Sequence, residues 1–197
     1  MANDNGKVDT ALAPQDDLPP LTTRKDHRFQ RWALILLRID IGFLFFWAFL
    51  DKTFGLGYAT SVAHDWLHGG SPTKGFLGGV VVGPFPGLFQ AFAGNALVDW
   101  LFMLGLLGVG VALILGIGIR PAVVVGSFMY LLMWLAVWPP ATMAAGQPTS
   151  STNPLIDEHT LGIFALLTIG SLIPRAQGPL GRWWASLPFI KRNPWLL

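Results

Sequence analysis

The sequence predicts an all-α membrane protein: a four-transmembrane-helix bundle with both termini cytoplasmic and an outer-face cap between helices 1 and 2. Of its 197 residues, 52% are hydrophobic and only 12% are charged, whereas a soluble domain carries roughly 25% charged residues. Four apolar stretches are long enough to cross a bilayer core, which takes about 20 helical residues. The 13 Lys and Arg residues gather toward the two ends of the chain, as expected when both ends lie in the cytoplasm.

The N-terminal segment, residues 1–28, is polar and lacks apolar periodicity, which predicts a disordered cytoplasmic tail. It does not resemble a cleavable signal peptide, so we expect the first span to direct insertion. The membrane domain is predicted over residues 29–175. Its first span, residues 31–50, follows a cluster of basic residues that ends at Arg31.

Residues 51–95 alternate glycines and prolines with aliphatic and aromatic side chains. Such a stretch is too interrupted to span the bilayer and too apolar to extend freely into water. It therefore predicts a cap on the outer face, built from short interfacial or re-entrant segments.

The second and third spans are predicted at residues 96–119 and 121–138. A short turn that contains Gly116, Gly118 and Arg120 separates them. So short a connection predicts an antiparallel hairpin, with Arg120 on the same side as the N-terminus.

The fourth span is predicted at residues 154–173, with Asn153 as the N-cap and Pro154 as the first helical residue. Pro174 ends it. Residues 176–197 follow as an amphipathic basic tail in the cytoplasm, whereas the 139–152 loop contains no Lys or Arg.

Composition also excludes several functions. The chain has no cysteine, which rules out disulfides, iron–sulfur clusters and thiol nucleophiles within it. Redox chemistry must then use a bound molecule or a partner. Binding of nucleic acid is not expected, because no polar domain presents a basic face with exposed aromatic residues.

Neither a metal nor haem is favoured by the histidines. His64 and His68 have the i, i+4 spacing of metal ligands. They lie in the cap beside two glycines and without a third ligand, so a solvated interfacial turn is favoured. A bis-histidine haem needs histidines on facing helices, and only His159 lies in a predicted span.

Two ionisable residues, Arg38 and Asp40, lie inside the first span. A charge there costs on the order of 2.5–3.5 kcal/mol, so it is a functional candidate by default. They are two positions apart, on nearly opposite faces of the helix, and cannot pair. The structural alternative is that Arg38 extends to the inner headgroups and that Asp40 binds another helix.

Several ionisable groups converge at the predicted outer ends of the spans: Asp51 and Lys52, Asp99, and Asp157, Glu158 and His159. Because successive spans alternate in direction, these groups occupy one level of the bundle although they are distant in sequence. Histidine can exchange a proton near neutral pH beside a carboxylate, as reduction of a quinone requires. Glu158 is better explained by the helix dipole. The candidate catalytic residues are His159, Asp157, Asp99, Asp51, Lys52 and Arg38, and the candidates for holding a quinone are His159, Trp47 and Asp99.

Five motifs in order resemble the DoxX/DoxD family of four-helix membrane proteins, over about residues 31–184. They are Leu37-Arg38, then WAFLDKTFG at 47–55, GGSPTKGFL at 69–77, GLLGVG at 105–110 and NPLIDEH at 153–159. The resemblance implies a multi-pass protein of a prokaryotic cytoplasmic (inner) membrane, related to the DoxD subunit of thiosulfate:quinone oxidoreductase. Other members look like membrane anchors for soluble redox or sulfurtransferase enzymes.

Two functions follow as expectations. In the first, the chain is a subunit that passes electrons to membrane quinone from a small reduced sulfur compound or from a partner enzyme. In the second, it is a non-catalytic accessory subunit, or membrane anchor, that docks a redox complex. In the first, thiosulfate is held by cations, for which Lys52, Lys74 and His64 are the candidates. Solute transport is not favoured, because the sequence shows no internal repeat.

Overall fold

The computed structural model describes residues 24–81, 83–138, 143–144, 147–148 and 153–197. Over these residues the chain is almost entirely helical, with one short antiparallel strand pair, β1 (Met143–Ala144) and β2 (Gln147–Pro148). The helices are α1 (Arg24–Phe54), η2 (Val62–His64), α2 (Lys74–Gly78), α3 (Pro86–Phe92), α4 (Ala96–Leu115), α5 (Ile119–Val137), α6 (Glu158–Ser171), α7 (Ile173–Ala176), α8 (Pro179–Ser186), α9 (Pro188–Arg192) and η3 (Pro194–Leu196).

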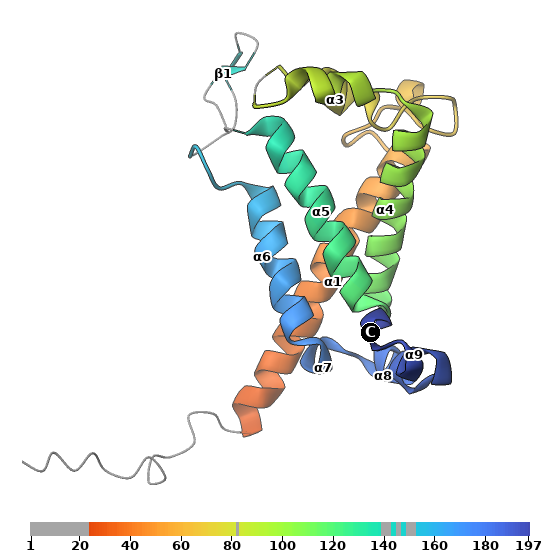
Figure 1. Cartoon of the computed structure of the whole chain (residues 1–197), viewed down its shortest axis with the longest axis vertical. Helices are drawn as coiled ribbons and strands as arrows, with labels where there is room; N and C mark the ends of the chain where they lie inside the picture. Colours follow the sequence, from red (N-terminus) through yellow and green to blue (C-terminus); the bar gives the residue numbers. More distant parts are fainter. Residues whose placement is uncertain (1–23, 82, 139–142, 145–146, 149–152) are drawn as a thin grey trace, which may run out of the picture.

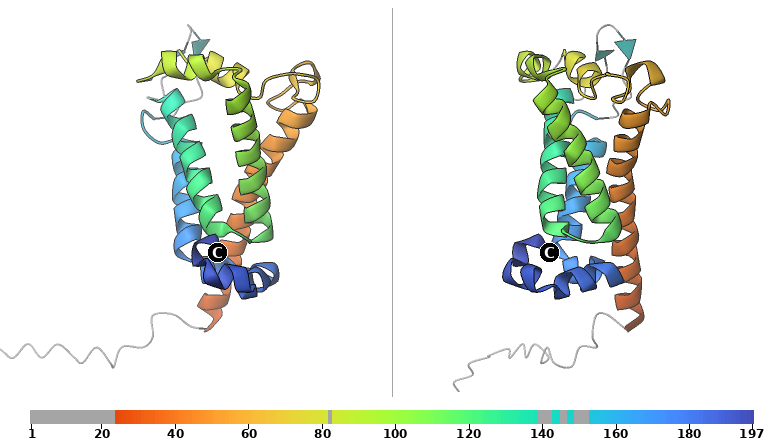
Figure 2. Two further views of the ribbon diagram at one scale, coloured as in Figure 1. Left: turned by 45° about the vertical axis from the view of Figure 1, so that its right-hand side comes forward. Right: turned by 90° about the vertical axis from the view of Figure 1, so that its right-hand side faces the viewer.

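Helices α1, α4, α5 and α6 pack around one hydrophobic core, and together they are called the helical domain here. Its most deeply buried side chains include Met103, Leu113, Leu166 and Ile169. Figures 1 and 2 show α2 and α3 across one end of the helical domain and α7, α8 and α9 at the other. The cap predicted between the first two spans is therefore present as a layer of short helices and turns.

Three helices are long and apolar enough to cross a membrane: the stretches Asp26–Phe54, Ala96–Leu115 and Ile119–Val137. The expected helical fold is confirmed, and these three helices fit a membrane protein by length and composition. Helix α6, which corresponds to the predicted fourth span, has only 14 residues. At 1.5 Å per residue it is about 21 Å long, which is shorter than a hydrocarbon core of about 30 Å.

The predicted start of the fourth span is wrong by four residues, because Asp157 rather than Asn153 is the N-cap. The Asp157 side chain accepts hydrogen bonds from the backbone of His159 and Thr160, and the Thr160 hydroxyl completes a capping box. Asn153 instead closes a turn by accepting from the N–H groups of Leu155 and Ile156. Asn153 and Asp157 are both residue types that favour the N-cap position. Asp157 takes it because its backbone N–H also donates to the Thr160 hydroxyl.

The other predicted helix boundaries also move, most of all at the start of α1, which lies at Arg24 instead of residue 31. α6 ends at Ser171 because Pro174 has no N–H to continue it and begins a separate turn, α7. Residues 24–28 belong to α1 rather than to a tail, while residues 1–23 lie outside the described residues. With 31 residues, or about 46 Å, α1 is longer than a bilayer core.

The antiparallel hairpin of α4 and α5 is confirmed. Gly116 and Gly118 both adopt left-handed conformations, with φ of 75° and 56°, which glycine accepts without strain. The C-terminal segment packs against this turn, where the guanidinium of Arg120 donates to the carbonyl of Pro194 at 2.6 Å. Residues 176–197, predicted as a basic tail, thus form folded helices in which Ile190 is fully buried.

Candidate functional site

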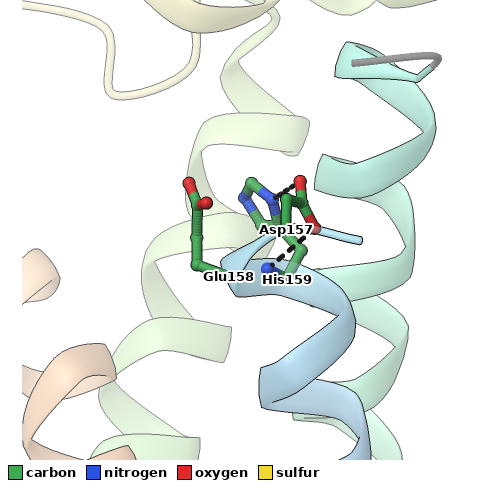
Figure 3. Close-up of side chains that lie close together, drawn as sticks. All are labelled: Asp157, Glu158 and His159. Carbon is green, nitrogen blue, oxygen red and sulfur yellow. Dashed lines mark hydrogen bonds and ion pairs between the residues drawn. The ribbon is translucent and has the colours of Figure 1, made fainter. Parts of the chain in front are cut away.

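The first turn of α6 brings two of the predicted site residues, Asp157 and His159, into direct contact (Figure 3). One Asp157 oxygen accepts from the backbone N–H groups of His159 and Thr160, and the other lies 2.8 Å from Nδ1 of His159. A carboxylate can only accept, so Nδ1 is the protonated ring nitrogen. Both side chains are mostly buried: His159 is 13% exposed and Asp157 is 15% exposed. The carboxylate thus caps the helix and also orients the imidazole.

Tyr130 of α5 completes this group, and the sequence analysis did not select it. Its ring meets the His159 ring edge-on, with centroids 6.0 Å apart, and the Phe45 ring at 4.9 Å. Gly162 makes room for it, since a Cβ there would collide with the Tyr130 ring. The only signal was that Tyr130 is one of two tyrosines and lies within a predicted span, where its hydroxyl needs a polar partner.

Glu158 also lies in this turn, but its side chain is separate from the pair (Figure 3). Asp157, Glu158 and His159 offer ligand atoms within 4.8 Å of one another. A cation held by all three would compete with the N–H groups that already occupy both Asp157 oxygens. Glu158 is exposed at the helix N-terminus, which matches the dipole role expected for it.

Asp51 is used by the turn that follows α1. It is 2% exposed and accepts from the backbone N–H groups of Tyr58 and Ala59, at 3.1 and 3.0 Å. Its neighbour Lys52 is half-buried. Trp47, one turn earlier, meets the Tyr58 ring edge-on at 5.2 Å, so it packs against the same turn.

Asp99 anchors the cap to α4. It is 6% exposed, and one of its oxygens accepts from the hydroxyls of Ser71 and Thr73, at 3.0 and 2.5 Å, and from the Thr73 backbone N–H at 3.2 Å. The structure therefore places Asp51 and Asp99 at the cap end, as predicted. Their hydrogen bonds connect them to the cap, however, and none connects them to His159.

Arg38 lies at the opposite end from His159. It is 3% exposed and donates from Nη1 to the carbonyl of Leu113, 2.6 Å away, in the last turn of α4. The Arg38 side chain therefore turns inward and caps a helix end. Asp40 is exposed on α1, and no described residue binds it, so the expected contact with another helix is absent from the described part of the chain.

The two cap histidines do not share a helix face. His64 ends η2 and its Nδ1 lies 2.9 Å from the Ser61 hydroxyl, whereas Nδ1 of His68 lies 2.8 Å from the buried carboxylate of Asp65. The His68 ring hydrogen bond, supported by the His68 backbone N–H, lowers the pKa of Asp65 despite its burial. Lys74 is exposed in α2, and no contact gathers Lys52, Lys74 and His64 into an anion site among the described residues.

No family model, curated protein or solved structure matches this chain.

Proposed function

We propose that this chain is the membrane subunit of a redox system in which the His159–Asp157 pair binds the headgroup of a membrane quinone. The observation that carries the proposal is the 2.8 Å contact between Nδ1 of His159 and Asp157, beside Tyr130. It leaves Nε2 of His159 without a partner among the described residues. In the imidazolium form, whose charge the Asp157 carboxylate balances, Nε2 also carries a proton, so it can donate a hydrogen bond to a quinone carbonyl and then transfer that proton.

The chemistry balances with the donor that the family resemblance suggests. Two thiosulfate ions joined by a new S–S bond release two electrons, and a quinone that takes up two electrons and two protons becomes a quinol. In the proposal, His159 delivers one proton to the quinone oxygen that it contacts, Asp157 holds the ring in position, and the second proton reaches the other quinone oxygen from water. The cysteine-free chain has no thiol to carry the sulfur chemistry, so we assign the electron donor site to a partner subunit.

The proposal includes a prokaryotic cytoplasmic membrane, with α6 as a shortened fourth span and both termini in the cytoplasm. Its support is the charge distribution. Arg120, Arg175 and Arg182 lie at the end that carries α7, α8 and α9, and the positive-inside rule puts such an end in the cytoplasm.

The test compares membranes that contain the native partner together with either the wild-type chain or one of three variants: His159→Ala, Asp157→Asn or His64→Ala. We expect His159→Ala to lose thiosulfate-dependent quinone reduction more than tenfold, because one charge-assisted hydrogen bond in a water-poor site is removed. His64 is an exposed cap histidine, so His64→Ala should stay within about twofold of wild type. Equal activities of His159→Ala and wild type would refute the site, and a wild-type complex inactive with every reduced sulfur donor would refute the enzyme.

A second candidate, a non-catalytic docking subunit, is favoured by Asp40. It is exposed on a helix long and apolar enough to span a membrane, next to the exposed side chains of Ile39, Phe43 and Leu44. A carboxylate that faces lipid is costly, and a cation or donor on a partner helix would remove that cost.

Asp40→Leu tests whether this face of α1 docks a partner. If Asp40 binds a partner, the variant should lose the subunit that copurifies with wild type, while Leu104→Ala, a change at an exposed position of α4, should retain it. Undiminished copurification with Asp40→Leu would contradict the docking role of this face.

A further inference from the structure

A cavity of about 670 Å³ lies between α1, the end of α4 and the start of α8. Its volume is typical of sites that bind small molecules. Its lining belongs to the start of α1, the end of α4 and the start of α8, which lie at the end of the helical domain opposite to the cap and the start of α6. Its lining residues are Arg28, Arg31, Trp32, Ile35, Arg38, Ile39, Ile114, Leu115, Gly178, Pro179 and Leu180.

Three arginines on one face of α1 supply positive charge to this cavity. Arg28, Arg31 and Arg38 follow helical spacing, so their side chains project from the same side. None of the described residues that line the cavity is acidic, and no ion pair involves these arginines within the described part of the chain. The cavity therefore has an uncompensated positive charge.

Arg38 provides an independent sign of a missing ligand. It is 3% exposed, and although Nη1 donates to Leu113, the buried Nε has no hydrogen-bond partner. Buried polar atoms are almost always satisfied, and an unsatisfied donor on a charged group is costly. An acceptor in the cavity would satisfy it. Gly116 leaves room for the guanidinium, because a Cβ there would collide with it.

The remaining lining of the cavity is apolar, which favours an amphiphilic ligand over a free ion. Ile35, Ile39, Ile114 and Leu115 form a hydrocarbon surface, and Trp32 lies where the apolar part of α1 begins. Tryptophan at this level is typical of the boundary between hydrocarbon and headgroups. The first turn of α8 also lines the cavity, and the N-terminus of a helix favours negative charge.

We propose that this cavity binds an anionic phospholipid, with its phosphate among Arg28, Arg31 and Arg38 and one acyl chain against Ile35, Ile39 and Leu115. Basic pockets at the ends of spanning helices recognise such headgroups through charge-assisted hydrogen bonds, which guanidinium groups form in pairs. The proposal rests on the chain spanning a membrane. It does not depend on the quinone site, which lies at the other end.

The test uses the full-length chain in a neutral detergent, with binding of dioleoyl phosphatidylglycerol followed by native mass spectrometry. We expect phosphatidylglycerol to bind at least tenfold more tightly than phosphatidylcholine. The double variant R28Q/R31Q should lose at least tenfold of this affinity. The matched control R182Q/K191Q removes two exposed charges outside the cavity lining and should change it less than twofold. His159→Ala should also leave lipid binding unchanged.

Three outcomes would overturn the proposal. Equal losses in the two double variants would mean that the attraction is only nonspecific charge. Inorganic phosphate that competes as well as phosphatidylglycerol would assign the cavity to a free anion. If R28Q/R31Q does not fold, the lipids that purify with the wild-type chain decide the question: enrichment of anionic phospholipid supports the proposal, and its absence refutes it.

Discussion

At the residue scale, the carboxylates that are buried in the described part of the chain hold backbone in place. Asp51, Asp65 and Asp99 are each at most 6% exposed, and each accepts at least one backbone N–H within the cap or the turn after α1. An ionised carboxylate accepts strong hydrogen bonds, and burial makes the loss of a partner expensive. These residues therefore explain how a glycine-rich segment keeps one conformation.

Asp65 makes the cap sensitive to acid. The ring of His68 lowers the pKa of Asp65 below its ordinary value of 3.8, so the fold favours the carboxylate. This stabilisation is complete above the ordinary pKa and is lost as the pH falls through the lowered pKa. We expect the protection of residues 62–70 from hydrogen exchange, measured by mass spectrometry and corrected for the intrinsic exchange rate at each pH, to decrease as the pH falls below 3.8, the ordinary pKa of the carboxyl.

Two histidine variants test the origin of this effect. His68→Ala removes the ring hydrogen bond, so the acid transition should move to higher pH, toward the ordinary pKa of an aspartate. His64→Ala should leave it in place, since His64 binds Ser61 instead. An unchanged transition in His68→Ala would show that another group controls the opening of the cap.

At the element scale, glycines set the distance between α1 and α4. A Cβ on Gly110 would lie 2.7 Å from the backbone nitrogen of Phe46, and one on Gly42 would lie 2.9 Å from that of Ile114. Small residues of this kind let two membrane helices approach closely. Gly110 and Gly42 therefore belong to the packing surface between α1 and α4.

Gly110→Ala and Gly108→Ala separate these roles. Gly110→Ala should destabilise the protein by about 1–3 kcal/mol, because the backbone of α1 cannot move aside locally. Nothing lies within 4 Å of a Cβ on Gly108, so Gly108→Ala should be neutral or stabilise α4 by up to about 1 kcal/mol. Denaturant unfolding in detergent micelles measures both. Similar stabilities of the two variants would contradict this close packing.

At the scale of the whole molecule, the polar groups divide between two ends. The His159–Asp157 pair and the cap carboxylates lie at one end, and the arginine-lined cavity with α7, α8 and α9 lies at the other. The buried interior between them is apolar. A chain arranged in this way can bind different ligands at the two surfaces of a membrane.

Single cysteines test the orientation, because the chain has no native cysteine. Lys74→Cys lies in the cap and Ser186→Cys lies at the end of α8, and both positions are exposed. An impermeant maleimide applied to intact cells should label position 74 and leave position 186 unlabelled until the membrane is opened. The reverse pattern would place the termini outside, and labelling of both from one side would exclude a membrane between them.

The sequence by itself determined the helical fold, the apolar helices long enough to cross a membrane, the tight α4–α5 turn and the cap, because these depend on local composition and spacing. Only the tertiary structure decided which ionisable residues share a site. Asp157 and His159 are two positions apart and meet through a helix cap, whereas Asp51 and Asp99 bind cap donors whose positions depend on the fold. The contact of Tyr130 with His159 and the burial of Arg38 against α4 join residues far apart in sequence. Local patterns specify helices, but the partner of a buried charge depends on which helices pack together.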